Sequence, residues 1–196
     1  MTPSLVIDAS VSGSWCFPEE ASTLSEAALE AVTRSGAVVP TLWMFEMANV
    51  LGVGERRGRI GAEAAAVIRE ALADLPIQLD GTRTLRSISD LTDLAREFDL
   101  TSYDASYLEL AIRTGSTLAT RDVSLMRAAT RAGVPLFSAY RFTTTSATAP
   151  AAMTSGMSTV SVRRRISFSR PARATMAAAA MRLCGAMALP SAAPRP

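Results

Sequence analysis

Four acidic residues stand at positions where a carboxylate can do chemistry. Asp8 directly follows a short apolar run, Glu46 lies inside an apolar helical segment, and two further aspartates each stand near the start of a predicted helix. A carboxylate buried alone costs several kcal/mol or becomes protonated, so a site that gathers several carboxylates needs a counter-charge. The candidate catalytic and metal-ligating residues are therefore Asp8, Glu46, Asp104 and Asp122.

Each of these acids also has an ordinary structural interpretation. Asp104 is placed where an acid complements the dipole of its helix, and Asp122 is placed where an aspartate can cap one. Glu46 can be read as a helical glutamate that faces outward. Asp8 has the weakest such interpretation, because it ends a buried strand. We do not expect all four to be merely structural, because the expected fold brings three of them to one edge of a sheet.

The composition excludes several classes of chemistry. All 20 basic residues are arginine and histidine is absent, which removes histidine-based triads, most catalytic zinc sites, Walker A phosphate binding and Schiff-base catalysis. A phosphoaspartate enzyme of the haloacid dehalogenase type is disfavoured as well. It needs a lysine, and a second aspartate where this chain has Ser10. The remaining carboxylates suit hard cations such as Mg²⁺.

Short apolar runs alternate with helical periods over the first 142 residues. This alternation predicts an α/β fold of three layers, with helices on both faces of a short-stranded, mostly parallel sheet. In such sheets ligands bind at the carboxyl ends of the strands, where Asp8 and Asp122 fall. Ser22 and Ser102 are the expected N-caps of two of the helices. The predicted strands are 4–8, 37–40, 77–79, 116–120 and 134–137; the predicted helices are 21–35, 41–54, 62–75, 82–98, 102–114 and 124–131.

The net charge of +2 averages two unlike parts of the chain. Residues 1–122 carry all 18 acids and 10 arginines, a net charge of −8, whereas residues 123–196 carry 10 arginines and no acid. We expect a folded domain over 1–142 and a low-complexity basic tail over 143–196, disordered or weakly helical. The tail is either an arm that holds RNA or an unselected extension, and we favour the extension.

Four motifs occur in a fixed order along the chain: Val6-Ile-Asp-Ala-Ser10, Phe45-Glu-Met-Ala-Asn49, Leu100-Thr-Ser-Tyr-Asp-Ala-Ser-Tyr-Leu-Glu-Leu-Ala111 and Leu118-Ala-Thr-Arg-Asp122. In sequence and spacing, residues 4–137 resemble a PIN-domain ribonuclease, specifically the VapC-type toxin of bacterial toxin–antitoxin pairs. The third motif is the most specific of the four. A lone aspartate at a strand end would mean little without the others.

The resemblance implies a cofactor and a reaction. Asp8, Glu46, Asp104 and Asp122 would bind one or two Mg²⁺ or Mn²⁺ ions, with the first and third as principal ligands. A metal-activated water would then cleave an RNA phosphodiester. We expect Thr120 and Asn49 to orient the carboxylates by hydrogen bonds.

The resemblance also implies protein partners. It predicts a homodimer and a small cognate antitoxin, which would plug the acidic site with a basic side chain. The alternative is a catalytically weak binding module of the same fold, which acts in an antitoxin complex that regulates its own operon. Trp15, Phe17, Trp43, Met44 and Phe45 are expected in the core or at such an interface.

Arginines near the motifs are candidate RNA contacts. Arg121 is the best placed, beside Asp122, whereas Arg56, Arg57 and Arg59 follow a glycine-containing helix and can equally form a solvated turn. That glycine segment has the wrong spacing for a phosphate-binding loop.

The cysteines and the absence of targeting signals bear on location. Cys16 and Cys184 have no metal-binding spacing, so we expect free thiols in a reducing compartment. We find no secretory signal and no apolar stretch of membrane-spanning length, and therefore expect a cytoplasmic protein.

Overall fold

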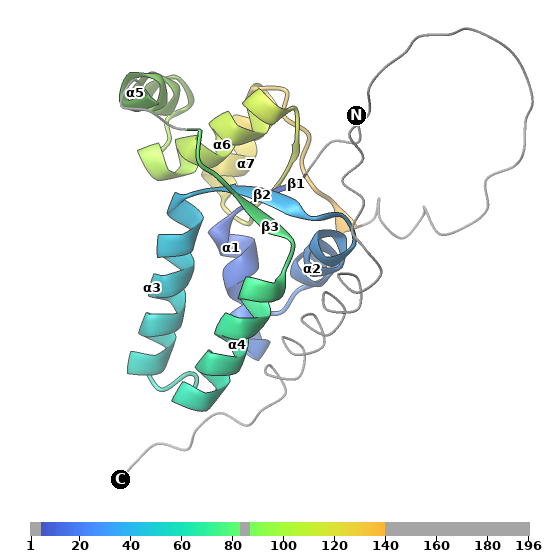
Figure 1. The fold of residues 1–196 in the computed structure, drawn as a ribbon. Helices are drawn as coiled ribbons and strands as arrows, with labels where there is room; N and C mark the ends of the chain where they lie inside the picture. The colour runs from blue at the N-terminus through green and yellow to red at the C-terminus, as the bar shows by residue number, and fades with distance from the viewer. Residues whose placement is uncertain (1–4, 83–86, 140–196) are drawn as a thin grey trace, which may run out of the picture.

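The computed structural model describes residues 5–82 and 87–139, whose arrangement is shown in Figure 1. Several expectations lie outside the described residues: the basic tail 143–196 with Cys184, the first residue of the predicted strand 4–8, and part of the predicted helix 82–98. The domain boundary at residue 142 lies outside them too.

Within the described residues, one sheet of four short parallel strands forms the centre of the fold. The strands are β1 (Leu5–Ile7), β2 (Ala37–Pro40), β3 (Ile77–Asp80) and β4 (Thr117–Ala119), in the order β3-β2-β1-β4. Val6 in β1 lies opposite Val38 on one side and Leu118 on the other. All three residues of β1 are buried, as expected for a strand covered on both faces.

Helices cover both faces of this sheet and complete the three predicted layers (Figure 1). The layer below the sheet in this view contains α1 (Ala9–Ser12), α2 (Thr23–Ser35), α3 (Leu42–Arg56) and α4 (Ala62–Asp74). The layer above it contains α5 (Ser87–Phe98), α6 (Ser102–Thr114) and α7 (Val123–Arg131). The predicted α/β architecture is therefore confirmed for the described residues.

The segment between β1 and α2 forms helices that the sequence pattern does not predict. After α1, two 3-10 helices follow, η1 (Gly13–Cys16) and η2 (Pro18–Glu20). Each element has only three or four residues, too few to show a helical period of apolar positions. Pro18 stands at the first position of η2, where its missing N–H costs no hydrogen bond.

The predicted strand 134–137 is wrong as an extended strand. It is reduced to one parallel bridge, between Leu118 and Leu136. Leu118 donates its N–H to the Pro135 carbonyl, and Phe137 donates its N–H to the Leu118 carbonyl. Pairing stops there because β4 has only three residues and Pro135 has no N–H to donate.

Helix caps agree with the sequence at α2 and differ from it at α6. Ser22 and Ser25 form a reciprocal capping box at the start of α2, as the predicted N-cap requires. At α6 the cap is Thr101, so the predicted cap Ser102 is wrong by one residue. The Thr101 hydroxyl accepts a hydrogen bond from the N–H of Asp104, the third helical residue that a capping side chain reaches.

The core contains most of the aromatic residues expected there. Trp15, Phe17 and Trp43 are buried, and both indoles are satisfied: Trp15 donates to the Ser25 carbonyl and Trp43 to the Ser12 hydroxyl. Met44 and Phe45 are different, with exposed fractions of 45% and 63%. They therefore belong to the surface, where the sequence also allowed an interface.

Cys16 is buried and forms no disulfide within the described part of the chain. Burial raises the pKa of its thiol to about 12, so the reactive thiolate is scarce at neutral pH. No helix of the described residues combines the length and the apolarity that a membrane span requires.

The glycine segment near the end of α3 is helical and packs tightly against Phe17. A Cβ added at Gly54 would lie 2.8 Å from two carbon atoms of the buried Phe17 ring. A Cβ at Gly52, two residues earlier in the same helix, would have Arg56 Nη1 at the end of a flexible side chain as its nearest neighbour, at 3.4 Å.

We expect Gly54→Ala to destabilise the protein by about 1–3 kcal/mol, because the new methyl group overpacks the Phe17 contact. Gly52→Ala is the matched control and should stabilise it by about 0.5–1 kcal/mol, because alanine favours the helix. Urea unfolding of both variants measures these changes. Equal stabilities of the two variants would contradict the packing described here.

Candidate active site

The candidate acids lie around the carboxyl edge of the sheet. Asp8 follows β1, and Thr120 and Asp122 follow β4, which is the direct neighbour of β1. In the sheet, β2 lies on one side of β1 and β4 on the other, so the connections from the carboxyl ends of neighbouring strands run in opposite directions at this point. Ligands of open α/β sheets bind at such a point.

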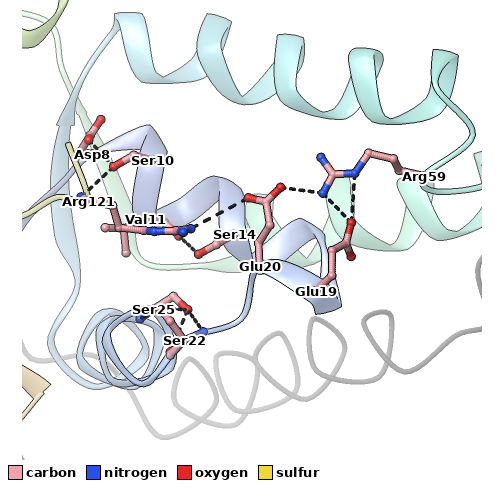
Figure 2. A network of polar contacts seen from close by, with 10 residues as sticks. All are labelled: Asp8, Ser10, Val11, Ser14, Glu19, Glu20, Ser22, Ser25, Arg59 and Arg121. Carbon is pink, nitrogen blue, oxygen red and sulfur yellow. Dashed lines mark hydrogen bonds and ion pairs between the residues drawn. The ribbon is translucent and has the colours of Figure 1, made fainter. Parts of the chain in front are cut away.

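Two hydroxyl groups fix the Asp8 carboxylate. Ser10 Oγ donates to Asp8 Oδ2 at 2.5 Å and Thr120 Oγ1 donates to the same oxygen at 2.7 Å. Each hydroxyl in turn accepts a backbone N–H from the loop before α7. The N–H of Arg121 reaches Ser10 Oγ at 2.9 Å and that of Asp122 reaches Thr120 Oγ1 at 3.0 Å. Figure 2 shows the Ser10 part of this network.

Glu46 on α3 is half-buried and faces the opposite helix layer. The hydroxyl of Tyr107, a buried residue of α6, donates to Glu46 Oε2. The outward-facing interpretation of Glu46 is therefore wrong. Tyr107 was not among the site residues predicted from the sequence, although it belongs to the third motif and lies three residues after Asp104 on the same helix.

Asp104 and Asp122 both make the contacts of helix-terminal acids. Asp104 Oδ2 accepts from the Thr101 hydroxyl at 2.7 Å, and Asp122 Oδ1 accepts the N–H of Leu125 at 2.7 Å as the N-cap of α7. The structural interpretation of each acid is thus present in the molecule. These contacts leave part of each carboxylate available, because an ionised carboxylate has about four acceptor positions.

The charges of Asp8, Glu46 and Asp104 act on one another. Burial is the main cause that raises the pKa of the Asp8 carboxyl, and the negative charge of Asp104 raises it further. Burial likewise raises the pKa of Glu46, with the charges of Asp8 and Asp104 adding to the effect. The structure therefore brings these three acids into one electrostatic unit, while Asp122 is linked to Asp8 through Thr120.

Within residues 5–82 and 87–139, no arginine neutralises this unit. Neither Asp8, Glu46 nor Asp104 forms an ion pair with an arginine among the described residues. In that same part of the chain, no three acidic, cysteine or histidine side chains already converge closely enough to hold a metal ion. The donor chemistry nevertheless fits a hard divalent cation, because mutually repelling carboxylates with neutral hydroxyl partners leave negative charge uncompensated.

Asn49 does not make the contact expected of it. It is exposed on α3 and forms no hydrogen bond with any of the four acids. Instead it lines a cavity of about 270 Å³ together with Ser10, Glu20 and Arg59. Asn49 lies one helical turn after Glu46, yet the residues that line this cavity include none of the four acids.

The four candidate arginines have different surroundings. Arg56 ends α3 and Arg57 follows it, both exposed to solvent. Arg59 is engaged by the carboxylates of Glu19 and Glu20. Arg121 is the one whose backbone is tied to the acid network, through Ser10.

Comparisons with known proteins identify the family of the chain. The PIN domain family model matches residues 5–130, so the chain belongs to the PIN-domain family. The chain is 31% identical over 121 residues to Ribonuclease VapC3 of Pyrobaculum aerophilum, which covers 62% of this chain and 91% of that relative. The resemblance that the four motifs carry is thereby confirmed.

A solved structure was also found, the crystal structure of PAE2754 from Pyrobaculum aerophilum. The two sequences are 25% identical, and the match covers 65% of this chain and 87% of the chain in that structure, with a TM-score of 0.48.

We expect Asp8→Asn to stabilise the metal-free protein at neutral pH by on the order of 1 kcal/mol. Burial raises the pKa of Asp8 above its ordinary value of 3.8, so ionised Asp8 opposes folding, whereas asparagine accepts the same hydrogen bonds without charge. The advantage should shrink as the pH falls toward 3.8, because the folded wild-type carboxyl, whose pKa is raised, takes up a proton and loses its unfavourable charge.

Urea unfolding in EDTA at neutral and mildly acidic pH measures this difference. Asp93→Asn is the control, because Asp93 is an exposed acid of α5 paired with Arg96. A wild-type protein as stable as Asp8→Asn at neutral pH would refute the idea that this carboxylate is electrostatically strained.

Proposed function

We propose that this PIN-domain protein is a VapC-type toxin, a metal-dependent endoribonuclease that cleaves RNA phosphodiester bonds. One observation carries the proposal: Asp8, Glu46 and Asp104 share an electrostatic unit at the carboxyl edge of the sheet, without a cation of the protein among the described residues. The relative named Ribonuclease VapC3 supports the same activity and substrate class.

The proposed cofactor is Mg²⁺ or Mn²⁺, as one or two ions. Asp8 and Asp104 would be the principal ligands, with Glu46 and Asp122 as supporting ligands. A bound divalent ion supplies positive charge that favours deprotonation of the attacking water and balances the charge that develops on the phosphodiester.

The side chains around the acids hold them in place without neutralising them. Asp8 is held by the hydroxyls of Ser10 and Thr120, Asp104 by Thr101, and Glu46 by Tyr107. Hydroxyl donors fix the direction of a carboxylate but leave its net charge available. An arginine in the same position would neutralise the carboxylate and compete with the metal ion for it. The hydroxyl shell therefore fits a site that must attract a cation.

The proposal includes protein partners beside the RNA. Phe45 and Tyr103 are exposed at 63% and 65%, and each directly precedes a site acid, Glu46 and Asp104. Apolar side chains exposed beside a charged site are typical of a surface that another protein covers. We assign this surface to the cognate antitoxin or to a second copy of the chain in a homodimer. A cytoplasmic location stays a prediction.

Substitution of the principal ligands is expected to abolish RNA cleavage. Asp8→Asn and Asp104→Asn should each lower Mg²⁺-dependent cleavage by at least about a hundredfold, because the ion contributes several kcal/mol to the reaction. EDTA should stop cleavage by the wild-type protein, and Mn²⁺ or Mg²⁺ in excess should restore it. Gel analysis of end-labelled RNA measures the rates.

Asp93→Asn is again the matched control and should cleave like the wild type. Full activity of both ligand variants, or cleavage that EDTA leaves unchanged, would refute the proposed mechanism. A wild-type chain that binds its antitoxin but cleaves no RNA with Mn²⁺ would instead favour the binding module that regulates its own operon.

A further inference from the structure

Glu20 lies between two arginines that come from distant parts of the chain. Its Oε1 accepts from Arg59 Nη2 at 2.6 Å, and its Oε2 lies 4.0 Å from Arg121 Nη1. Figure 2 shows the glutamate extended between the two guanidinium groups, with Asp8 and Ser10 beyond Arg121. The second 3-10 helix therefore carries an acid that faces the candidate active site across an arginine.

The Arg59 end of this bridge is firmly anchored. Arg59 Nε and Nη2 also donate to Glu19 Oε1, at 3.0 and 2.5 Å. The guanidinium lies over the Phe17 ring, 3.6 Å from its centroid, and Phe17 is itself buried. Two carboxylates and an aromatic face hold Arg59, so it is poorly placed to contact RNA. Its position fixes that of Glu20 instead.

The Arg121 end of the bridge is loose. At 4.0 Å the pair is at the limit of an ion pair, and the two side chains keep 41% and 37% of their exposure. Exposed pairs of this kind are worth about 0–1 kcal/mol, so another anion can replace Glu20 at little cost. The Arg121 guanidinium makes no other hydrogen bond or ion pair with a described residue.

The backbone of Arg121, by contrast, is fixed next to the acids. Its N–H donates to Ser10 Oγ, which donates to Asp8 Oδ2. The cavity of about 270 Å³ begins at the same Ser10 and has Glu20 and Arg59 in its wall. Arg121 therefore contacts two residues of this cavity, Ser10 through its backbone N–H and Glu20 through its guanidinium.

An arginine suits one anion at this place especially well. The planar guanidinium donates two parallel hydrogen bonds to a phosphate, which a carboxylate at 4.0 Å does not receive here. We propose that Arg121 binds a phosphate of the RNA strand beside the cleaved bond, and that Glu20 is a positioning residue that occupies the Arg121 guanidinium until this phosphate displaces it. This inference rests on the proposed nuclease function and names the side of the site along which the RNA runs.

The test is RNA binding measured separately from cleavage. A short fluorescein-labelled single-stranded RNA is titrated with the full chain in EDTA, and anisotropy gives the affinity at several salt concentrations. Arg121→Gln should weaken binding about fivefold or more. It should also reduce the slope of log affinity against log salt by about 0.7, the loss of one phosphate contact on a single strand. The backbone N–H that Ser10 accepts is kept in this variant.

Arg34→Gln is the matched arginine control. Arg34 is exposed and paired with Glu30 near the end of α2, which leads into the start of β2 and so lies at the opposite edge of the sheet. This variant should bind RNA as the wild type does. If Arg121→Gln and Arg34→Gln bind with equal affinity, the assignment of Arg121 is overturned.

Glu20→Gln tests the positioning role. It removes the anion that competes with RNA for Arg121, so binding should become severalfold tighter. Glu19→Gln is the matched control, because it removes one negative charge beside Arg59 from a residue that does not contact Arg121. Glu20→Gln should therefore exceed Glu19→Gln in affinity. In an Arg121→Gln background the two glutamate variants should become indistinguishable.

A gain from Glu20→Gln that equals that of Glu19→Gln, or that persists without Arg121, overturns the positioning role. These failures are distinguishable from failure of the proposed function. If the wild-type chain binds no RNA in EDTA or in Mg²⁺, both the nuclease proposal and this inference are refuted. If the wild-type chain binds and cleaves RNA but the Arg121 and Glu20 substitutions leave the RNA affinity unchanged, the inference alone is refuted.

Discussion

The repulsion among three carboxylates at the end of a parallel sheet is the constraint on which the rest of the site depends. The Asp8 side chain is buried, with 4% of the residue exposed. The charge of Asp104 raises the pKa of Asp8, and the charges of Asp8 and Asp104 raise the pKa of Glu46. Parallel strands create this situation, because their carboxyl ends meet at one edge and bring together residues far apart in the sequence. Such a cluster costs folding free energy unless a cation is bound.

Neutral hydroxyl groups donate hydrogen bonds to these carboxylates, and the nearby arginines pair with other acids. Four hydroxyl groups, from Ser10, Thr101, Tyr107 and Thr120, orient the acids without cancelling their charge. The nearby arginines are occupied by other acids instead. Arg59 is bound by two glutamates, and Arg121 is shared loosely with one of them. Arg121 therefore places positive charge beside the site without pairing with any of its acids.

The sequence was informative where a residue type and a strand end coincide. Asp8 and Asp122 stand at the ends of short apolar runs predicted as strands, so their place at the carboxyl edge was expected from the parallel topology. Tyr107 was missed because its contact with Glu46 depends on how α3 and α6 pack against each other, and no local pattern encodes that packing. Thr101 was missed by one position, because the neighbouring Ser102 is also a residue type that favours the N-cap.

Other differences also arise from tertiary context. The Asn49 side chain was expected to orient a carboxylate, but the direction of α3 turns it toward a cavity instead. The predicted strand 134–137 has apolar residues typical of a strand, yet its neighbour β4 is too short to pair along it. The first helices after β1 have too few residues for any periodic signal. In each case the missing information is the length or orientation of a neighbouring element.

Calorimetric titration with Mn²⁺ tests most directly whether the acidic unit exists to bind a cation. The account predicts that the wild-type chain binds one or two Mn²⁺ ions and that Tyr107→Phe, which keeps the buried ring but frees Glu46, binds them more weakly. Asp8→Asn should lose most of the binding. A wild-type chain that takes up no Mn²⁺, or an Asp8→Asn chain that binds it equally well, would contradict the central claim.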